Sequence, residues 1–226
     1  QTRFFRLHGS APGQIDTLTK ATKMLGIMQL HDMVLGDSAI KTMDIPNDIV
    51  PLKNFWRSSL FAAIFIQILS KEVGIHHADR LFVIGLLHEI GHLVMYAKYP
   101  KQAKLALDNS LINRQMIHLE EQSLLGFHYG EIGAKLMAYW QLPTHFQQMA
   151  QFQPTPAQAP VFVSETALLH LAHGYAQKTF NSQDCDLELL IAPQAWGILN
   201  LEPNQIENTL DDALQTTTEM ESFILN

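Results

Sequence analysis

The chain has 226 residues, a formal net charge of −7 and a hydrophobic content of 47%. This length suits one large domain or two small ones, and the apolar content is sufficient for a sizeable core. General nucleic-acid binding needs a basic surface, which an acidic net charge disfavours. No nucleic-acid partner is therefore expected. The single cysteine, Cys185, cannot form a disulfide within the chain and fits a reducing cytoplasm.

The N-terminal part predicts short helices and turns. Apolar residues recur at helical spacing over 15–24 and 27–35, and prolines mark the polar segment 37–51 as a loop. The first strong helix is predicted over 53–71. Nearly every position from 60 to 69 is apolar, so this helix should be buried on most sides.

The stretch 81–96 places three ionisable side chains inside an otherwise apolar sequence. We predict one continuous helix over 77–98 that contains His88, Glu89 and His92. Burying these groups without partners would cost several kcal/mol each, so hydrogen bonds, a metal ion or both must compensate. The same groups interrupt the longest apolar run, and no membrane span is expected.

The remainder of the chain continues in helical patterns. Helices are predicted over 101–108, 113–125, 128–140, 145–150, 163–180, 187–199 and 203–225. In 113–125 the inward face should hold Met116, Leu119 and Leu124. Three prolines make 151–160 an extended loop. Because no strand alternation occurs anywhere, the fold class is all-α, a single-domain multi-helix bundle in which 181–226 belongs to the same domain.

Two interpretations of the central motif compete. Read as His-Glu-x-x-His, it places His88 and His92 four residues apart on one helix face, the zinc-binding spacing of metalloproteases, with Glu89 as the base. Read as Leu-Leu-His-Glu-Ile-Gly-His, it is similar to the His-Asp motif of the HD phosphohydrolase superfamily, with Glu in place of Asp.

Five short motifs in a fixed order resemble the HDOD family, the HD-related output domain of bacterial signalling proteins. They are Ala-Thr-Lys-Met-Leu-Gly at 21–26, Phe-Trp-Arg-Ser-Ser at 55–59, Gly-Leu-Leu-His-Glu-Ile-Gly at 85–91, and the segments 121–128 and 133–143. The resemblance implies a helical bundle over 1–226, with the N-terminal helices of the family incomplete.

The resemblance also implies a remnant metal site. Its candidate ligands are His88, Glu89, His128 and His173, for a divalent ion such as Mn, Fe, Ni or Zn. Its pocket neighbours are Ser58, His92 and Glu121. Ser58 stands where active relatives carry a ligating His, Phe152 falls where they carry another, and His173 stands near their final Asp. We therefore expect no cofactor and interpret the cluster as hydrogen-bonded polar groups.

The expected function is a cytoplasmic, non-catalytic regulatory domain that binds a signalling protein or a small ligand and could form an oligomer. The first alternative is a metal-dependent phosphohydrolase acting on a nucleotide or cyclic dinucleotide. The second is a His-Glu-x-x-His zinc protease. Trp56 and Trp140 are predicted core residues. The histidines outside the cluster are predicted at the surface or at helix caps: His76, His77, His118, His145 and His170.

Overall fold

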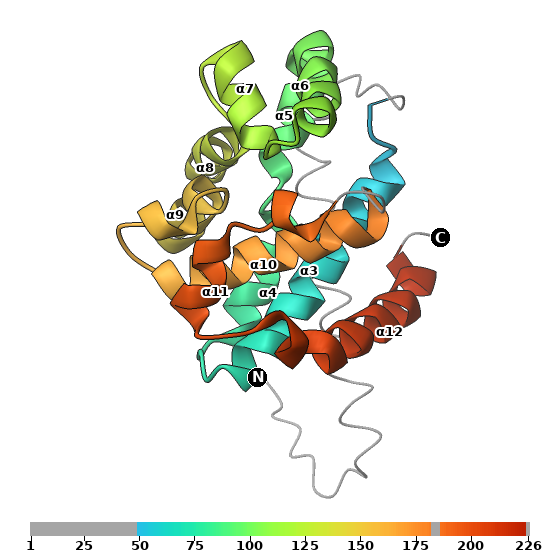
Figure 1. Ribbon diagram of the computed structural model, residues 1–226, viewed down its shortest axis with the longest axis vertical. Helices are drawn as coiled ribbons and strands as arrows, with labels where there is room; N and C mark the ends of the chain where they lie inside the picture. Colours follow the sequence, from blue (N-terminus) through green and yellow to red (C-terminus); the bar gives the residue numbers. More distant parts are fainter. Residues whose placement is uncertain (1–48, 182–185, 225–226) are drawn as a thin grey trace, which may run out of the picture.

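The computed structural model describes residues 49–181 and 186–224, and none of these residues forms a strand (Figure 1). The all-α prediction is therefore confirmed for this part of the chain. The helices predicted over 15–24 and 27–35, most of the loop 37–51, the motif at 21–26 and Cys185 lie outside the described residues.

The helices follow one another with short connections. In chain order they are α3 (Leu52–Glu72), α4 (Ala78–Leu87), α5 (Ile90–Lys98), α6 (Pro100–Asn113), α7 (Ile117–Leu125), α8 (Tyr129–Tyr139), α9 (Thr144–Phe152), η1 (Pro156–Gln158), α10 (Val163–Phe180), η2 (Leu187–Leu189), α11 (Pro193–Leu199), η3 (Pro203–Ile206) and α12 (Glu207–Ile224). The three η elements are single turns of 3₁₀-helix.

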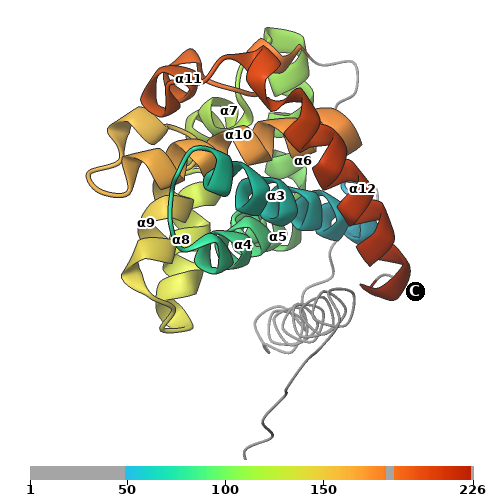
Figure 2. The ribbon, with the colours of Figure 1, turned by 90° about the horizontal axis from the view of Figure 1, so that it is seen from below.

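Helix α3 is the centre of the core. It packs against α4, α10 and α12 (Figures 1 and 2), which explains why its sequence is apolar on almost every side. The expected burial of this helix is confirmed, and Trp56 is a core residue as predicted. On its outer side, Thr209 of α12 donates a hydrogen bond to Glu72 at 2.6 Å.

The predicted single helix over 77–98 is wrong, because a turn at His88 and Glu89 divides it into α4 and α5. Glu89 has φ −98° and ψ 7°, outside the helical region. The run 78–98 has the length and mean hydropathy of a membrane-crossing helix, yet 78% of its apolar window is buried inside the protein. Burial of that extent is typical of a core helix in a globular domain.

Close backbone packing fixes the direction of α5. A Cβ atom on Gly91 would lie 2.0 Å from the Tyr129 carbonyl oxygen and 2.7 Å from the Gly133 nitrogen. Only glycine allows α5 and α8 to approach this closely. The start of α8 is thereby held beside the turn at His88 and Glu89.

The predicted inward face of 113–125 is wrong at Leu119, whereas Met116 and Leu124 are half-buried. Leu119 is 48% exposed, whereas the buried residues of α7 are His118, Glu120 and Glu121. The buried side of α7 instead carries polar side chains that have hydrogen-bond partners on neighbouring elements. Asn113 donates a hydrogen bond to Glu120 at 2.7 Å, and His92 contacts Glu121.

His118 and His170 were predicted at the surface, and both are buried. His170 Nδ1–H donates to the Gln153 carbonyl at 2.7 Å, and Nε2 accepts from the Ala192 backbone N–H at 2.8 Å. This imidazole therefore fastens the segment after α9 and the start of α11 onto α10. The proline-rich segment is a partly buried part of the core that includes η1, so the prediction of an extended loop is only partly right.

Replacing Gly91 with alanine should destabilise the fold strongly. The new methyl group would overlap backbone atoms of α8, so we expect a loss of roughly 3 kcal/mol in the free energy of unfolding. The control is Gly197→Ala in α11, where an added Cβ meets no atom within 4 Å and should change stability by less than about 1 kcal/mol. Urea denaturation of both variants tests this, and equal midpoints would contradict it.

Stability should fall in mild acid because of His170. Burial lowers its pKa from 6.5 to about 4, so between these values the unfolded chain binds a proton that the folded chain does not. The contribution is therefore complete above pH 6.5 and is lost as the pH falls. In His170→Gln, the slope of unfolding free energy against pH between 5 and 6.5 should decrease by about one proton. An unchanged slope in His170→Gln would contradict the assignment.

Candidate functional site

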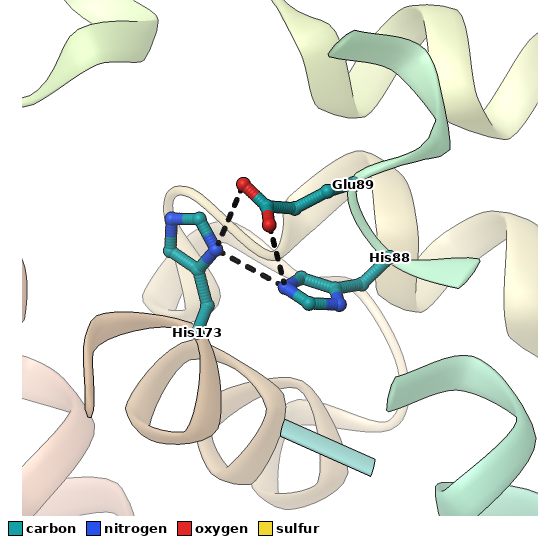
Figure 3. Close-up of side chains that lie close together, drawn as sticks. All are labelled: His88, Glu89 and His173. Atoms are coloured by element: carbon teal, nitrogen blue, oxygen red, sulfur yellow. Dashed lines mark hydrogen bonds and ion pairs between the residues drawn. The ribbon is translucent and has the colours of Figure 1, made fainter. Parts of the chain in front are cut away.

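Three side chains meet where α4, α5 and α10 come together: His88, Glu89 and His173 (Figure 3). The turn between α4 and α5 supplies His88 and Glu89 as neighbours, and the middle of α10 supplies His173. All three are buried, with exposures of 0%, 3% and 6%. Their nitrogen and carboxylate ligand atoms lie within 4.8 Å of one another.

A backbone hydrogen bond on the side away from the cluster fixes the orientation of the His88 ring. Its Nδ1 lies 2.7 Å from the Gly85 carbonyl oxygen, which can only accept, so Nδ1 carries the proton. The lone pair of Nε2 then faces the centre of the cluster, 3.1 Å from His173 Nδ1. Burial lowers the pKa of both imidazoles, that of His173 to about 3, so both are neutral at pH 7.

Glu89 connects α5 to α10. Its Oε1 accepts a hydrogen bond from Gln177 Nε2 at 2.8 Å and another from His92 Nδ1 at 3.2 Å. Burial alone would raise the pKa of Glu89, but the neighbouring imidazoles of His173, His92 and His88 outweigh burial and lower it to about 2. The group is therefore a carboxylate at neutral pH.

His92 lies between two carboxylates. Its Nδ1 contacts Glu89 Oε1 at 3.2 Å and its Nε2 contacts Glu121 Oε1 at 3.0 Å. The ring stacks on Tyr129 with centroids 4.0 Å apart and lies parallel to Tyr96 at 5.4 Å. Burial lowers the pKa of His92, but the charge and hydrogen bond of Glu121, together with those of Glu89, outweigh it and raise the pKa to about 9. His92 is therefore an imidazolium at neutral pH.

A cavity of about 350 Å³ borders the cluster. Glu89, His173 and Gln177 line it on the cluster side. Aromatic and aliphatic side chains form much of the remaining wall, among them Phe55, Tyr96, Leu107, Phe180 and Leu190. A cavity of this size, with both apolar and polar groups in its wall, is suited to a small molecule.

The structure brings together three of the four candidate ligands. His128 instead caps the N-terminus of α8, where its ring lies 5.9 Å from that of His118 and 6.2 Å from that of Tyr129. Ser58 is fully buried in α3, and its hydroxyl has no hydrogen-bond partner among the described residues. Of the predicted neighbours, His92 contacts Glu89 of the cluster directly, and Glu121 contacts His92.

Sequence reasoning missed Gln177 and Tyr129. Gln177 follows His173 by four residues, so both project from the same face of α10, and this spacing could have identified it. Tyr129 gave no such signal, because its role depends on α8 packing against α5. Its backbone N–H donates to Glu121 Oε2 at 2.9 Å, and its hydroxyl contacts Gln153.

The geometry does not favour the protease interpretation. A His-Glu-x-x-His zinc site needs His88 and His92 to face one ion from a continuous helix. Here the helix breaks between them, His88 faces His173, and both nitrogens of His92 are held by carboxylates.

A family model of the HDOD domain matches residues 8–156, about two thirds of the chain. The chain belongs to the HDOD domain family. His173 and Gln177 lie beyond the matched residues. No curated protein sequence matches this HDOD chain.

Solved structures show the same fold. An HDOD domain protein of unknown function from Geobacter sulfurreducens is 18% identical, with a TM-score of 0.65 over 81% of this chain and 65% of its own. A candidate phosphohydrolase from Shewanella amazonensis SB2B is 24% identical, with a TM-score of 0.60 over 76% and 64%. A candidate signal transduction protein from Marinobacter aquaeolei VT8 is 20% identical, with a TM-score of 0.59 over 75% and 38%. The chain thus spans less than two thirds of each of these proteins.

Replacing His92 with leucine should be strongly destabilising. Glu89 and Glu121 would lose the cation that they share, and breaking a buried ion pair in this way costs about 3–5 kcal/mol. Adding Glu121→Gln to His92→Leu removes one of the two carboxylates that no longer face a cation. The double variant should therefore recover part of the lost free energy of unfolding. Chemical denaturation of the single and double variants measures both effects. A loss below about 1 kcal/mol in His92→Leu would contradict a charged bridge.

Proposed function

We propose that this HDOD domain is a regulatory signal-transduction module that does not turn over substrate. The observation that carries the proposal is the burial of Ser58, a residue that is not a usual metal ligand. The resemblance to HD enzymes requires a ligand from this position of α3, yet Ser58 is a buried hydroxyl without a polar contact among the described residues. Phe152, at the end of α9, leaves a second ligand position with an apolar side chain.

The arrangement of the cluster supports a regulatory role. Through Glu89 and its partners His92 and Gln177, α5 is joined to α7 and α10. The cavity lies against these same hydrogen bonds, so a ligand that enters it competes for Glu89 or Gln177. Such a ligand would favour one arrangement of α5 and α10 over another, which is sufficient for signalling if the two differ by a few kcal/mol.

The second candidate function is a metal-dependent phosphohydrolase acting on a nucleotide or cyclic dinucleotide. It is favoured by the convergence of two neutral imidazoles and one carboxylate beside a cavity. A bound ion would supply a Lewis acid for phosphoryl chemistry. In either function the domain is proposed to act in the cytoplasm, on a small ligand or a signalling protein.

Assays of phosphodiester hydrolysis distinguish the two functions. The purified protein is incubated with bis(p-nitrophenyl) phosphate and with cyclic dinucleotides, with Mn²⁺, Fe²⁺, Ni²⁺ or Zn²⁺ in turn. We expect no turnover above that of the His88→Ala variant, because the ligand positions at Ser58 and Phe152 are lost. Metal-dependent turnover that disappears in both His88→Ala and His173→Ala would contradict the proposal and establish the phosphohydrolase.

A further inference from the structure

We propose that the cavity beside the cluster binds an organic cation, a protonated amine carried on an apolar body, with its ammonium group next to Glu89. The inference rests on the proposed function in one respect, because it names the class of ligand to which the regulatory pocket responds. Three features of the described residues carry it: the hydrogen-bonding groups at the polar end of the cavity, the charge of its wall, and its apolar side.

The carboxylate at the polar end of the cavity has one oxygen that accepts no hydrogen bond. Oε1 of Glu89 accepts from Gln177 and His92. Oε2 accepts none within the part of the chain that the structure describes, and its nearest polar neighbour there is His88 Nε2, 3.9 Å away. That nitrogen carries a lone pair, because the proton of His88 is on Nδ1. A ligand must therefore bring the hydrogen to Oε2.

The second group at this end, His173, also offers an acceptor. Its Nδ1 lies 3.1 Å from His88 Nε2 and 3.5 Å from Glu89 Oε1, so Nδ1 carries the proton. Nε2 of the neutral ring then has a lone pair. Since Glu89 and His173 both line the cavity, its polar end selects a ligand with N–H or O–H donors over one that has only acceptors.

The ionised groups at the cavity leave a negative charge. His92 is one cation between two carboxylates, Glu89 and Glu121, so one negative charge remains even when His92 is fully protonated. The other charged side chains of the wall, Lys104 and Asp108, pair with each other at 3.2 Å and 3.3 Å. A phosphate or carboxylate would meet no unpaired cation among the described residues of this wall. An ammonium group would instead form a charge-assisted hydrogen bond with Glu89.

The apolar side of the cavity determines the body of the ligand. Apolar side chains reach the cavity from three elements, namely Phe55 of α3, Leu107 of α6 and Leu189 of η2. A volume of about 350 Å³ lies at the lower end of the range for ligand pockets, so the body is compact. An amine on a small ring system or a short alkyl chain satisfies both the polar end and this apolar side.

An amine bound at Glu89 would act on α10. Gln177 Nε2 donates to Glu89 Oε1 at 2.8 Å, and Asn181 Nδ2 donates to Gln177 Oε1 at 3.1 Å. These hydrogen bonds join the start of α5 to the C-terminal end of α10. An ammonium donor competes with Gln177 for the carboxylate, so ligand binding is coupled to the attachment of α10 to α5.

The test is a calorimetric titration of the full chain with three probes that share one aromatic body. They are naphthylmethylamine, a cation at neutral pH, naphthylmethanol, which is uncharged, and naphthylacetate, an anion. A chelator is present throughout, so that no metal ion competes for Glu89. We expect one equivalent of the amine, bound at least roughly tenfold more tightly than the alcohol, because it adds a hydrogen bond to a charged group. The acetate should show no saturable binding.

Two variants separate the charge of Glu89 from the shape of the cavity. Glu89→Gln keeps the size of the side chain and should lower the affinity for the amine to that for the alcohol, whose persistent binding shows that the pocket is intact. Leu107→Trp fills the cavity and should weaken the binding of both probes at least roughly tenfold. The matched control is Leu105→Trp on the same helix. Leu105 is 46% exposed and does not line the cavity, so both affinities should stay unchanged.

The inference is wrong if the unmodified protein binds none of the three probes, binds the amine no more tightly than the alcohol, or prefers the acetate. These results need no variant. It is also wrong if Glu89→Gln keeps the preference for the amine, or if Leu105→Trp weakens binding as much as Leu107→Trp does. Failure of the amine to bind leaves the proposed regulatory function standing. Phosphodiester turnover would instead remove that function, and the preference among the probes would still be decided by the titration.

Discussion

The site depends on one buried interaction, the His92 imidazolium between Glu89 and Glu121. Two carboxylates this deep in a helical core would be very costly without a cation, and His92 supplies it with both nitrogens. Stacking on Tyr129 fills the space around the charge. Buried ion groups of this kind contribute more to a unique arrangement than to stability. Here they fix the mutual position of α5, α7 and α10.

The remainder of the site follows from that arrangement. Since one oxygen of Glu89 is taken by His92 and Gln177, the carboxylate is held with its other oxygen toward His88. The break between α4 and α5 turns His88 and Glu89 toward α10, where His173 meets them. Glu89 and His173 of this cluster also line the cavity. In the function proposed above, this cluster and its cavity serve binding and regulation in place of turnover.

The helical spacing of apolar residues correctly predicted those helices that pack against apolar neighbours. The range 163–180 was predicted to the residue, and the burial of α3 followed from its composition. The failures at α7 and at His170 share one cause, a polar side chain that is buried because hydrogen-bond partners are available to it. Leu119 was expected inside because its apolar side chain fits the helical period, but the fold buries Glu120 and Glu121, which bond to Asn113 and His92. His170 was expected outside because its two backbone partners, at Gln153 and Ala192, lie far from it in the sequence. The turn at His88 and Glu89 accompanies the close approach of α8 to Gly91. The local sequence around the turn does not predict this approach.

The resemblance to the HDOD family supplied the site residues that periodicity could not. It placed His88, Glu89 and His173 in one candidate site, and it also included His128, which the fold uses as a helix cap. The most direct test of the account is the protonation state of His92, measured by ¹⁵N NMR of the histidine side chains as a function of pH. The account predicts that both ring nitrogens of His92 carry protons at pH 7 and that the ring loses one of these protons only near the pKa of about 9. A neutral His92 ring at pH 7 would contradict it.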